Sequence, residues 1–268
     1  MTVKDIYDSN VISVTTTEDQ EEVANTIKKY DINAIAVTTN DNKLVGIITA
    51  DDIIDVIVEE TTEDIQMMAN VNPLEDEYTK TSAFELAKKG VGWLVLLMIL
   101  STFTSFIMNR FEDAMAVVPA LSIFIPMLID TAGNAGNQSS NVIIRALGLN
   151  EISAKDYIRV VGKEFLSSLI VGIITAAANF LWIIILAKIN IIDLSTANIN
   201  AYELGLLVSS SMLLCIMLSK FIGSSLPLLC KLIKVDPALL AGPMVTTLVD
   251  ASSLILYFVM AVNIFKLV

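Results

Sequence analysis

The stretch PMVTTLVDASSLILYFVMAVNIF, residues 243–265, decides the fold class of this chain. A helix needs about 20 predominantly apolar residues to cross a lipid bilayer, and this stretch has that length with one charged side chain, Asp250. An ionised carboxylate at membrane depth costs about 2.5–3.5 kcal/mol on insertion scales. We therefore expect Asp250 to face a water-filled cavity, an ion or a partner charge. The alternative is that Asp250 only holds neighbouring helices together through hydrogen bonds.

The composition separates an acidic region from an apolar one. The 268 residues are 54% hydrophobic and carry a formal net charge of −12, with most of the acids before residue 90. This pattern is typical of a membrane protein with one soluble domain. Residues 1–30 contain no apolar signal-peptide core, so we expect the soluble head, residues 1–65, to stay in the cytosol.

The residue types limit the chemistry that the chain can perform. The sequence has no histidine, which removes the commonest general base and most zinc or copper sites. Cys215 and Cys230 lie in the apolar region without metal-ligand spacing, so we expect small buried side chains. Because the chain also lacks a phosphate-binding loop and an evident nucleophile with its base, we do not expect an enzyme. A bound metal would have oxygen ligands.

The apolar region predicts five membrane-spanning helices. They are expected at residues 91–108, 114–134, 165–187, 203–226 and 243–265. Lysine and arginine fall in alternate loops, and the basic loops share the side of the head, which the positive-inside rule makes the cytoplasmic face of the plasma membrane. Lys220 lies inside the fourth span, where it must reach the cytoplasmic edge or pair with an acid, and Asp130 is the candidate partner.

Within the head, the pattern predicts elements in the order β-α-β-β-α. This order, together with the run from Gly46 to Asp52, resembles a single CBS motif. The resemblance implies that Thr49 and Asp52 reach the phosphate and ribose of an adenine nucleotide such as ATP, as an acid beside a helix N-terminus can do. CBS motifs normally work in pairs, so the partner motif comes from a second chain or from a longer natural protein. The alternative is a dimerisation element with an empty nucleotide cleft.

An acidic run lies at the end of the head. Seven acids are interleaved with apolar residues between positions 51 and 64, and helical spacing places several on one face, where like charges repel unless a cation lies between them. Magnesium takes carboxylate ligands and keeps several waters, so acids shared between subunits can bind it weakly. We expect such a site to involve Glu59, Glu60 and Glu63. The alternative is a solvated acidic face. Residues 66–90 are expected to connect this run to a membrane domain at 91–268.

The second expected span ends in the polar run DTAGNAGNQSS, residues 130–140, which is too polar to contact lipid. The amides of Asn134, Asn137 and Gln138 can bond freed backbone groups or the water shell of an ion, so we expect this run to line a cavity. Here the chain resembles the MgtE family of magnesium channels and transporters along essentially its whole length. The motifs that carry the resemblance are the CBS motif, Thr62-Glu63-Asp64-Ile65, GNAGNQ at 133–138, Arg145-Ala146-Leu147, Asp236-Pro237-Ala238, Pro243 and Asp250.

The resemblance implies a homodimer in a lipid bilayer, with a pore on the two-fold axis lined by the second and fifth spans. It implies that two copies of Asp250 hold hydrated Mg²⁺, helped by backbone carbonyls near Thr246 and by Asn134, Asn137 and Gln138. It also implies that Mg²⁺ on the acidic run and the head closes the pore, and that nucleotide adjusts this closure. Family members usually carry an acidic helical N-terminal domain and two CBS motifs, and this sequence begins at what resembles the second motif.

We therefore predict a divalent cation channel or transporter that carries Mg²⁺ inward down its electrochemical gradient, with no nucleic-acid partner. Two alternatives remain open. The first is an ion-coupled carrier in which Asp250 takes up a proton. The second is a membrane-anchored nucleotide sensor that conducts nothing.

Overall fold

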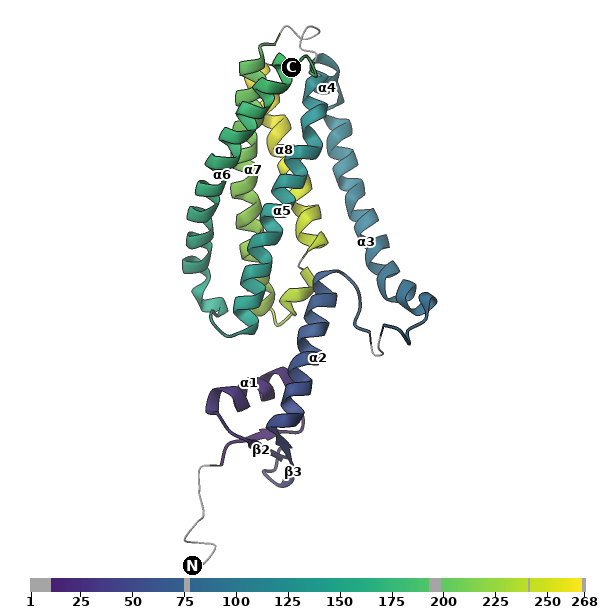
Figure 1. Cartoon of the computed structure of the whole chain (residues 1–268), viewed down its shortest axis with the longest axis vertical. Helices are drawn as coiled ribbons and strands as arrows, with labels where there is room; N and C mark the ends of the chain where they lie inside the picture. Colours follow the sequence, from purple (N-terminus) through teal and green to yellow (C-terminus); the bar gives the residue numbers. More distant parts are fainter. Residues whose placement is uncertain (1–10, 75–77, 193–198, 241, 267–268) are drawn as a thin grey trace, which may run out of the picture. The chain divides into compact units, whose positions relative to one another are not determined.

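The structure is a computed structural model that describes residues 11–74, 78–192, 199–240 and 242–266. The chain divides between Ile65 and Gln66 into two compact units (Figure 1). The first unit is the head. The second unit holds the long helices, and we call it the bundle.

The head has the element order that the sequence predicted. Its elements are β1 (Ser13–Thr15), α1 (Gln20–Tyr30), β2 (Ala34–Thr38), β3 (Leu44–Thr49) and the beginning of α2 (Ala50–Met68). Strand β2 lies in the middle of the sheet, parallel to β1 and antiparallel to β3. Apolar residues from both helices and the sheet form one small core, whose most buried members are Val14, Val23, Ile27, Ile35 and Ile53.

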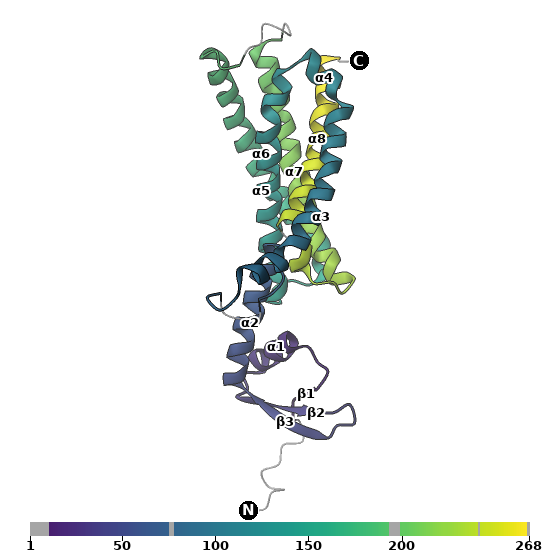
Figure 2. The same ribbon diagram turned by 90° about the vertical axis from the view of Figure 1, so that its right-hand side faces the viewer.

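The bundle is built mainly of long helices. The helices are α3 (Ala83–Arg110), α4 (Glu112–Val117), α5 (Ala120–Gly148), α6 (Tyr157–Lys188), α7 (Ala201–Leu232) and α8 (Pro243–Phe265), with 3₁₀ turns η2 (Ala154–Asp156) and η3 (Pro237–Leu240). Helix α7 packs against α5, α6 and α8, and α5 also packs against α8, as Figures 1 and 2 show. Helix α3 packs mainly on α8 and keeps most of its apolar surface exposed, as a lipid-facing helix would.

Within the described part of the chain, four helical segments are long and apolar enough to cross a membrane. They are α3, η2 with α6, α7 and α8. The expected second span, residues 114–134, falls on α4 and the first half of α5. Helix α5 is long enough to cross a membrane, but it is less apolar than these four because it carries the polar run 130–140. The protein is thus a helical membrane protein with a small α/β head, and the count of five spans stays a prediction.

Close contacts at one end of the bundle fix how α5 and α8 meet. The hydroxyl of Tyr257 on α8 donates a hydrogen bond to the carbonyl of Leu121 on α5 over 3.0 Å, and the Phe258 ring stacks on Phe111 at 4.8 Å. Tyr257 and Phe258 are completely buried in the largest apolar core of the bundle, and the partly buried Phe111 packs against that core. The polar run of α5 comes after this core along the helix. The packing of the earlier α5 residues therefore fixes the position of the polar run beside α8.

Candidate functional site

The polar run of α5 meets the first half of α8. Gly133 faces α8, and a methyl group added there would lie 2.8 Å from Thr246 Cγ2 and 3.6 Å from Asp250 Oδ1. The two helices approach this closely because Gly133 has no side chain. One turn further, Asn137 Nδ2 donates a hydrogen bond to Thr246 Oγ1 over 2.9 Å. The structure therefore brings together Gly133, Asn137, Thr246 and Asp250, which belong to two motifs far apart in the sequence.

Asp250 lacks the partners that a purely structural carboxylate would have. Its Oδ1 atom is buried and has no hydrogen-bond partner among the described residues. Asn137 Oδ1 is in the same condition. A buried oxygen without a donor is costly unless something else satisfies it. The site thus presents unpaired carboxylate and amide oxygens, which are the ligand types of hard cations such as Mg²⁺ and of their water shells.

The other residues of the motif lie on a neighbouring face of α5. Asn134 and Gln138 are four positions apart and both have exposed side chains in the single chain. They are not brought against α8 as Asn137 is. Thr246 also donates its hydroxyl to the carbonyl of Gly242 over 3.1 Å, which ties it to the first turn of α8.

An adjacent face of α5 is packed against α7 through small residues, which the sequence reasoning did not anticipate. The Gly223 Cα lies so close to the backbone of Gly136 that a methyl group on it would overlap the Gly136 carbonyl. In the same contact, the hydroxyl of Ser219 donates a hydrogen bond to the carbonyl of Ala132. Small residues four apart on α7, Ser219 and Gly223, are a known signal of close helix packing in membranes and could have predicted this contact.

The expected pairing of Lys220 with Asp130 is wrong. Lys220 Nζ lies 3.2 Å from Glu164 Oε2 on α6, and Asp130 is exposed on α5. The reason is the helical period: six residues separate Asp130 from Gly136, the α5 residue that meets α7, so the two point about 120° apart around the helix. Lys220 is 7% exposed, and Glu164 compensates its buried charge. The two cysteines are buried and free, as predicted.

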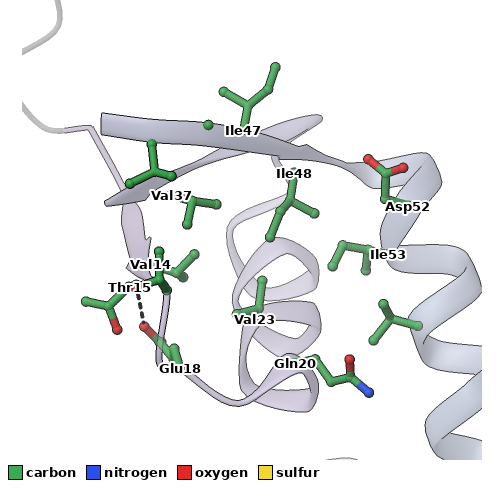
Figure 3. A pocket seen from close by; sticks show the side chains of 14 residues that line it. Val14, Thr15, Glu18, Gln20, Val23, Val37, Ile47, Ile48, Asp52 and Ile53 are labelled. Atoms are coloured by element: carbon green, nitrogen blue, oxygen red, sulfur yellow. Dashed lines mark hydrogen bonds between the residues drawn. The ribbon is translucent and has the colours of Figure 1, made fainter. Parts of the chain in front are cut away.

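A separate cavity of about 500 Å³ lies in the head between the sheet and its helices. Figure 3 shows Asp52 where the sheet runs into α2, with Thr15 and Glu18 elsewhere on the rim. The lining is otherwise mostly apolar, including Val23 and Ile53.

Thr49 does not line this cavity, and it engages the acid that does. Its hydroxyl and its backbone N–H donate to Asp52 Oδ2 over 2.6 and 3.1 Å, an arrangement that caps the start of α2. The hydrogen bond from the Thr49 hydroxyl, followed by that from its N–H, holds the pKa of Asp52 below its ordinary value. Asp52 is therefore an ionised group beside the cavity that also has a structural task.

The three acids expected to bind magnesium lie on α2 without forming a metal cluster. Glu59 is exposed, Glu63 is partly buried, and Glu60 accepts a hydrogen bond from Gln20 over 2.6 Å. In the described residues of this single chain, no group of three or more acids or cysteines is close enough to hold a metal ion. The predicted site therefore needs ligands from a second subunit or from water.

These features define a multi-pass helical membrane protein that has an α/β head and a polar, carboxylate-containing site between two of its helices. The chain belongs to the MgtE family: residues 125–260 match the family model described as a divalent cation transporter. Residues 3–59 match the CBS domain. Both resemblances inferred from the motifs are thus confirmed, and the family is one of transporters and not of enzymes.

Curated relatives support this assignment along the whole chain. The sequence is 37% identical to the magnesium transporter MgtE of Bacillus subtilis over 256 residues, which are 96% of this chain and 54% of the relative. It is 34% identical to the magnesium transporter MgtE of Thermus thermophilus over 260 residues, 97% of this chain and 55% of the relative. The Enterococcus faecalis protein of the same name is also 34% identical. The chain spans about half the length of the curated relatives it matches.

Proposed function

We propose that this protein carries Mg²⁺ across the plasma membrane through a pore at the interface of a homodimer, lined by α5 and α8. The observation that carries the proposal is the buried, unpartnered Oδ1 of Asp250 beside Gly133 and the Asn137–Thr246 hydrogen bond. An acid that only joined helices would have a donor on a neighbouring helix. The family description supports a divalent cation as the cargo, and the names of the relatives favour Mg²⁺.

The chemistry of the site suits an ion that keeps its water. Mg²⁺ loses its inner water shell reluctantly, so recognition through carboxylates and amides around a hydrated ion is favoured over a dry cage. Two copies of Asp250 supply charge, while Asn134, Asn137, Gln138 and backbone carbonyls near Thr246 hold the water shell. Moving two charges down about 100 mV, inside negative, releases about 4.6 kcal/mol, so inward flux needs no other fuel.

The head and the acidic run on α2 are the proposed regulatory part. Helix α2 is continuous from Ala50 to Met68 and carries all three acids that are expected to bind Mg²⁺. We infer that cytosolic Mg²⁺ bound between subunits by Glu59, Glu60 and Glu63 closes the pore. ATP in the cavity beside Asp52 would adjust this closure, with the head on the cytosolic side.

A flux assay on the purified chain in liposomes tests the transport function. The unmodified chain should carry Mg²⁺, Asp250→Asn should lose most of the flux, and Asp250→Ala should lose more because it removes the ligand as well as the charge. Ser252→Ala is the matched control: Ser252 lies on the same helix and bonds only the Leu248 carbonyl within the described chain, so its flux should be unchanged. Normal flux through Asp250→Asn would refute the pore assignment.

The same assay separates the two alternatives. Flux that persists after proton and sodium gradients are removed argues against a coupled carrier, in which Asp250 would load a proton. No flux at all from folded protein would favour a membrane-anchored nucleotide sensor.

A further inference from the structure

A buried charge pair joins three helices of the bundle. Lys220 Nζ on α7 lies 3.2 Å from Glu164 Oε2 on α6 and 3.1 Å from Ser167 Oγ. The same Glu164 oxygen accepts a hydrogen bond from Ser139 on α5 over 2.6 Å. One carboxylate atom therefore receives donors from both α5 and α7. None of these residues belongs to the contact between α5 and α8 described above.

Ser139 occupies a special place on α5. It lies two residues after Asn137, and two residues correspond to about 200° around an α-helix. The two side chains therefore leave α5 on nearly opposite sides within one turn. Asn137 is bonded to Thr246 on α8, and Ser139 is bonded to Glu164 on α6. The rotation of this turn about the helix axis is fixed from both sides.

Directional bonds limit how far α5 can turn against its neighbours. Gly136 and Gly223 meet backbone to backbone, and a glycine surface by itself offers little resistance to turning. In the same contact, the Ser219 hydroxyl donates a hydrogen bond to the carbonyl of Ala132 on α5. The bond from Ser139 to Glu164 adds a second directional restraint, from α6.

Stability alone is a poor explanation of the charge pair. Burying two charges costs hydration that their attraction often fails to repay, and apolar groups of similar volume commonly replace such pairs without loss. Lys220 and Glu164 side chains are only 8% and 16% exposed. The carboxylate of this buried pair also binds a third helix, which indicates that the pair positions the helices relative to one another.

We propose that Glu164 is a positioning residue for ion passage: anchored by Lys220, it binds the Ser139 hydroxyl and so sets the rotation of α5 that presents Gly133 and Asn137 to α8. This inference rests on the proposed function, in which α5 and α8 line the ion path. Glu164 does not touch the ion. It acts through Ser139.

The test measures Mg²⁺ influx into liposomes over a range of Mg²⁺ concentrations, using the full chain. Ser139→Ala removes one hydroxyl and no charge, and Glu164→Gln keeps the shape of the side chain. Each should raise the half-saturating Mg²⁺ concentration roughly tenfold while changing the maximal flux less, because a turned α5 holds the hydrated ion less well. In the double variant, the half-saturating Mg²⁺ concentration should be no higher than in Glu164→Gln alone, because both changes act through one bond. It should therefore lie roughly tenfold below the value expected from two independent effects.

The matched control is Ser167→Ala, which removes the other hydroxyl beside Lys220 without touching α5, and its half-saturating concentration should not move. Lys220→Arg keeps the positive charge, so its half-saturating Mg²⁺ concentration should also stay unchanged. If Glu164→Gln reduces the yield of folded protein, the result for Ser139→Ala tests the inference. An unmoved half-saturating concentration in folded Ser139→Ala, with normal flux in the unmodified chain, overturns this inference alone. No flux in the unmodified chain overturns the proposed function and the inference with it.

Discussion

Asn137 Nδ2 lies 2.9 Å from Thr246 Oγ1, and this hydrogen bond joins the polar run of α5 to the first turn of α8. The Thr246 hydroxyl in turn donates a hydrogen bond to the Gly242 carbonyl, at the start of α8. The contact lies one turn of α5 from Gly133 and one turn of α8 from Asp250. Any rotation of α5 against α8 therefore changes the surroundings of the carboxylate.

Breaking this bond should weaken transport without abolishing it. Thr246→Val keeps the shape of the side chain and removes the hydroxyl, and a hydrogen bond of this kind is worth about 0.5–1.5 kcal/mol net, so flux should fall severalfold. Thr246→Ser restores the hydroxyl and should keep most of the flux. Asn137→Ala should resemble Thr246→Val. A loss through Thr246→Val as large as that of Asp250→Asn would mean that the hydroxyl, and not the charge, governs the ion.

The proposed homodimer predicts that two copies of Asp250 face each other across its axis. Asp250→Cys, in a background with Cys215→Ala and Cys230→Ala, should form a disulfide between subunits on oxidation, seen as a dimer on a non-reducing gel. Leu254→Cys is the control, because Leu254 is one turn further along α8 and 1% exposed within the single chain. Equal cross-linking at both positions would remove the support for an axis at Asp250.

The backbone contact between α5 and α7 predicts an asymmetric response to added methyl groups. Gly223→Ala places a methyl group on the Gly136 carbonyl, and overpacking of this kind costs about 1–3 kcal/mol. Gly162→Ala on α6 meets nothing within 4 Å and should be neutral or stabilising by about 0.5–1 kcal/mol, because alanine loses less backbone entropy. Thermal unfolding in detergent compares the two, and equal melting temperatures would contradict the packing described here.

Mg²⁺ should protect the head from protease if the acidic run senses it. The triple variant Glu59→Gln, Glu60→Gln and Glu63→Gln should lose this protection, since the like charges that a divalent ion would relieve are gone. Asp41→Asn, in the exposed loop between β2 and β3, is the control and should keep it. Equal digestion of the unmodified chain with and without Mg²⁺ would refute the sensor.

Acid should loosen the start of α2. The Thr49 hydroxyl and N–H lower the pKa of Asp52 from 3.8, so its stabilising effect is fully present above that pH and is lost as the pH falls through the lowered pKa. Hydrogen exchange at the first amides of α2, corrected for intrinsic rates, should accelerate on acidification from about pH 5 to about pH 2 beyond any change in Asp52→Asn. Asp52→Asn keeps an oxygen for Thr49 but no charge. Identical pH profiles would show that the ionised cap contributes nothing.

The same variant sharpens the nucleotide question. If ATP binds in the head cavity through the Asp52 carboxylate, calorimetry should give heat with the unmodified chain and much less with Asp52→Asn, which still offers an oxygen to Thr49. Heat retained by Asp52→Asn would place the nucleotide elsewhere, and no heat from either protein would leave the CBS motif as a dimerisation element.

Much of this protein could be read from its sequence, because the signals are local. The apolar runs predicted α3, α6, α7 and α8, the alternation and turns predicted the head, and the two motifs around GNAGNQ and Asp250 predicted the family. In each case the physical cause acts over one element: hydrophobic length sets a span, and period sets a helix or strand. A lone acid in an apolar helix is conspicuous for the same reason.

Only the tertiary structure decided which side chains meet. Lys220 pairs with Glu164 and not with Asp130, and Asn137 binds Thr246. Thr49 caps the helix that starts at Ala50. These outcomes depend on how far each helix is turned about its axis, and a change of one residue in register moves a side chain by about 100°. That rotation is set by close packing between helices, such as the meeting of Gly136 with Gly223, which no single segment of sequence encodes.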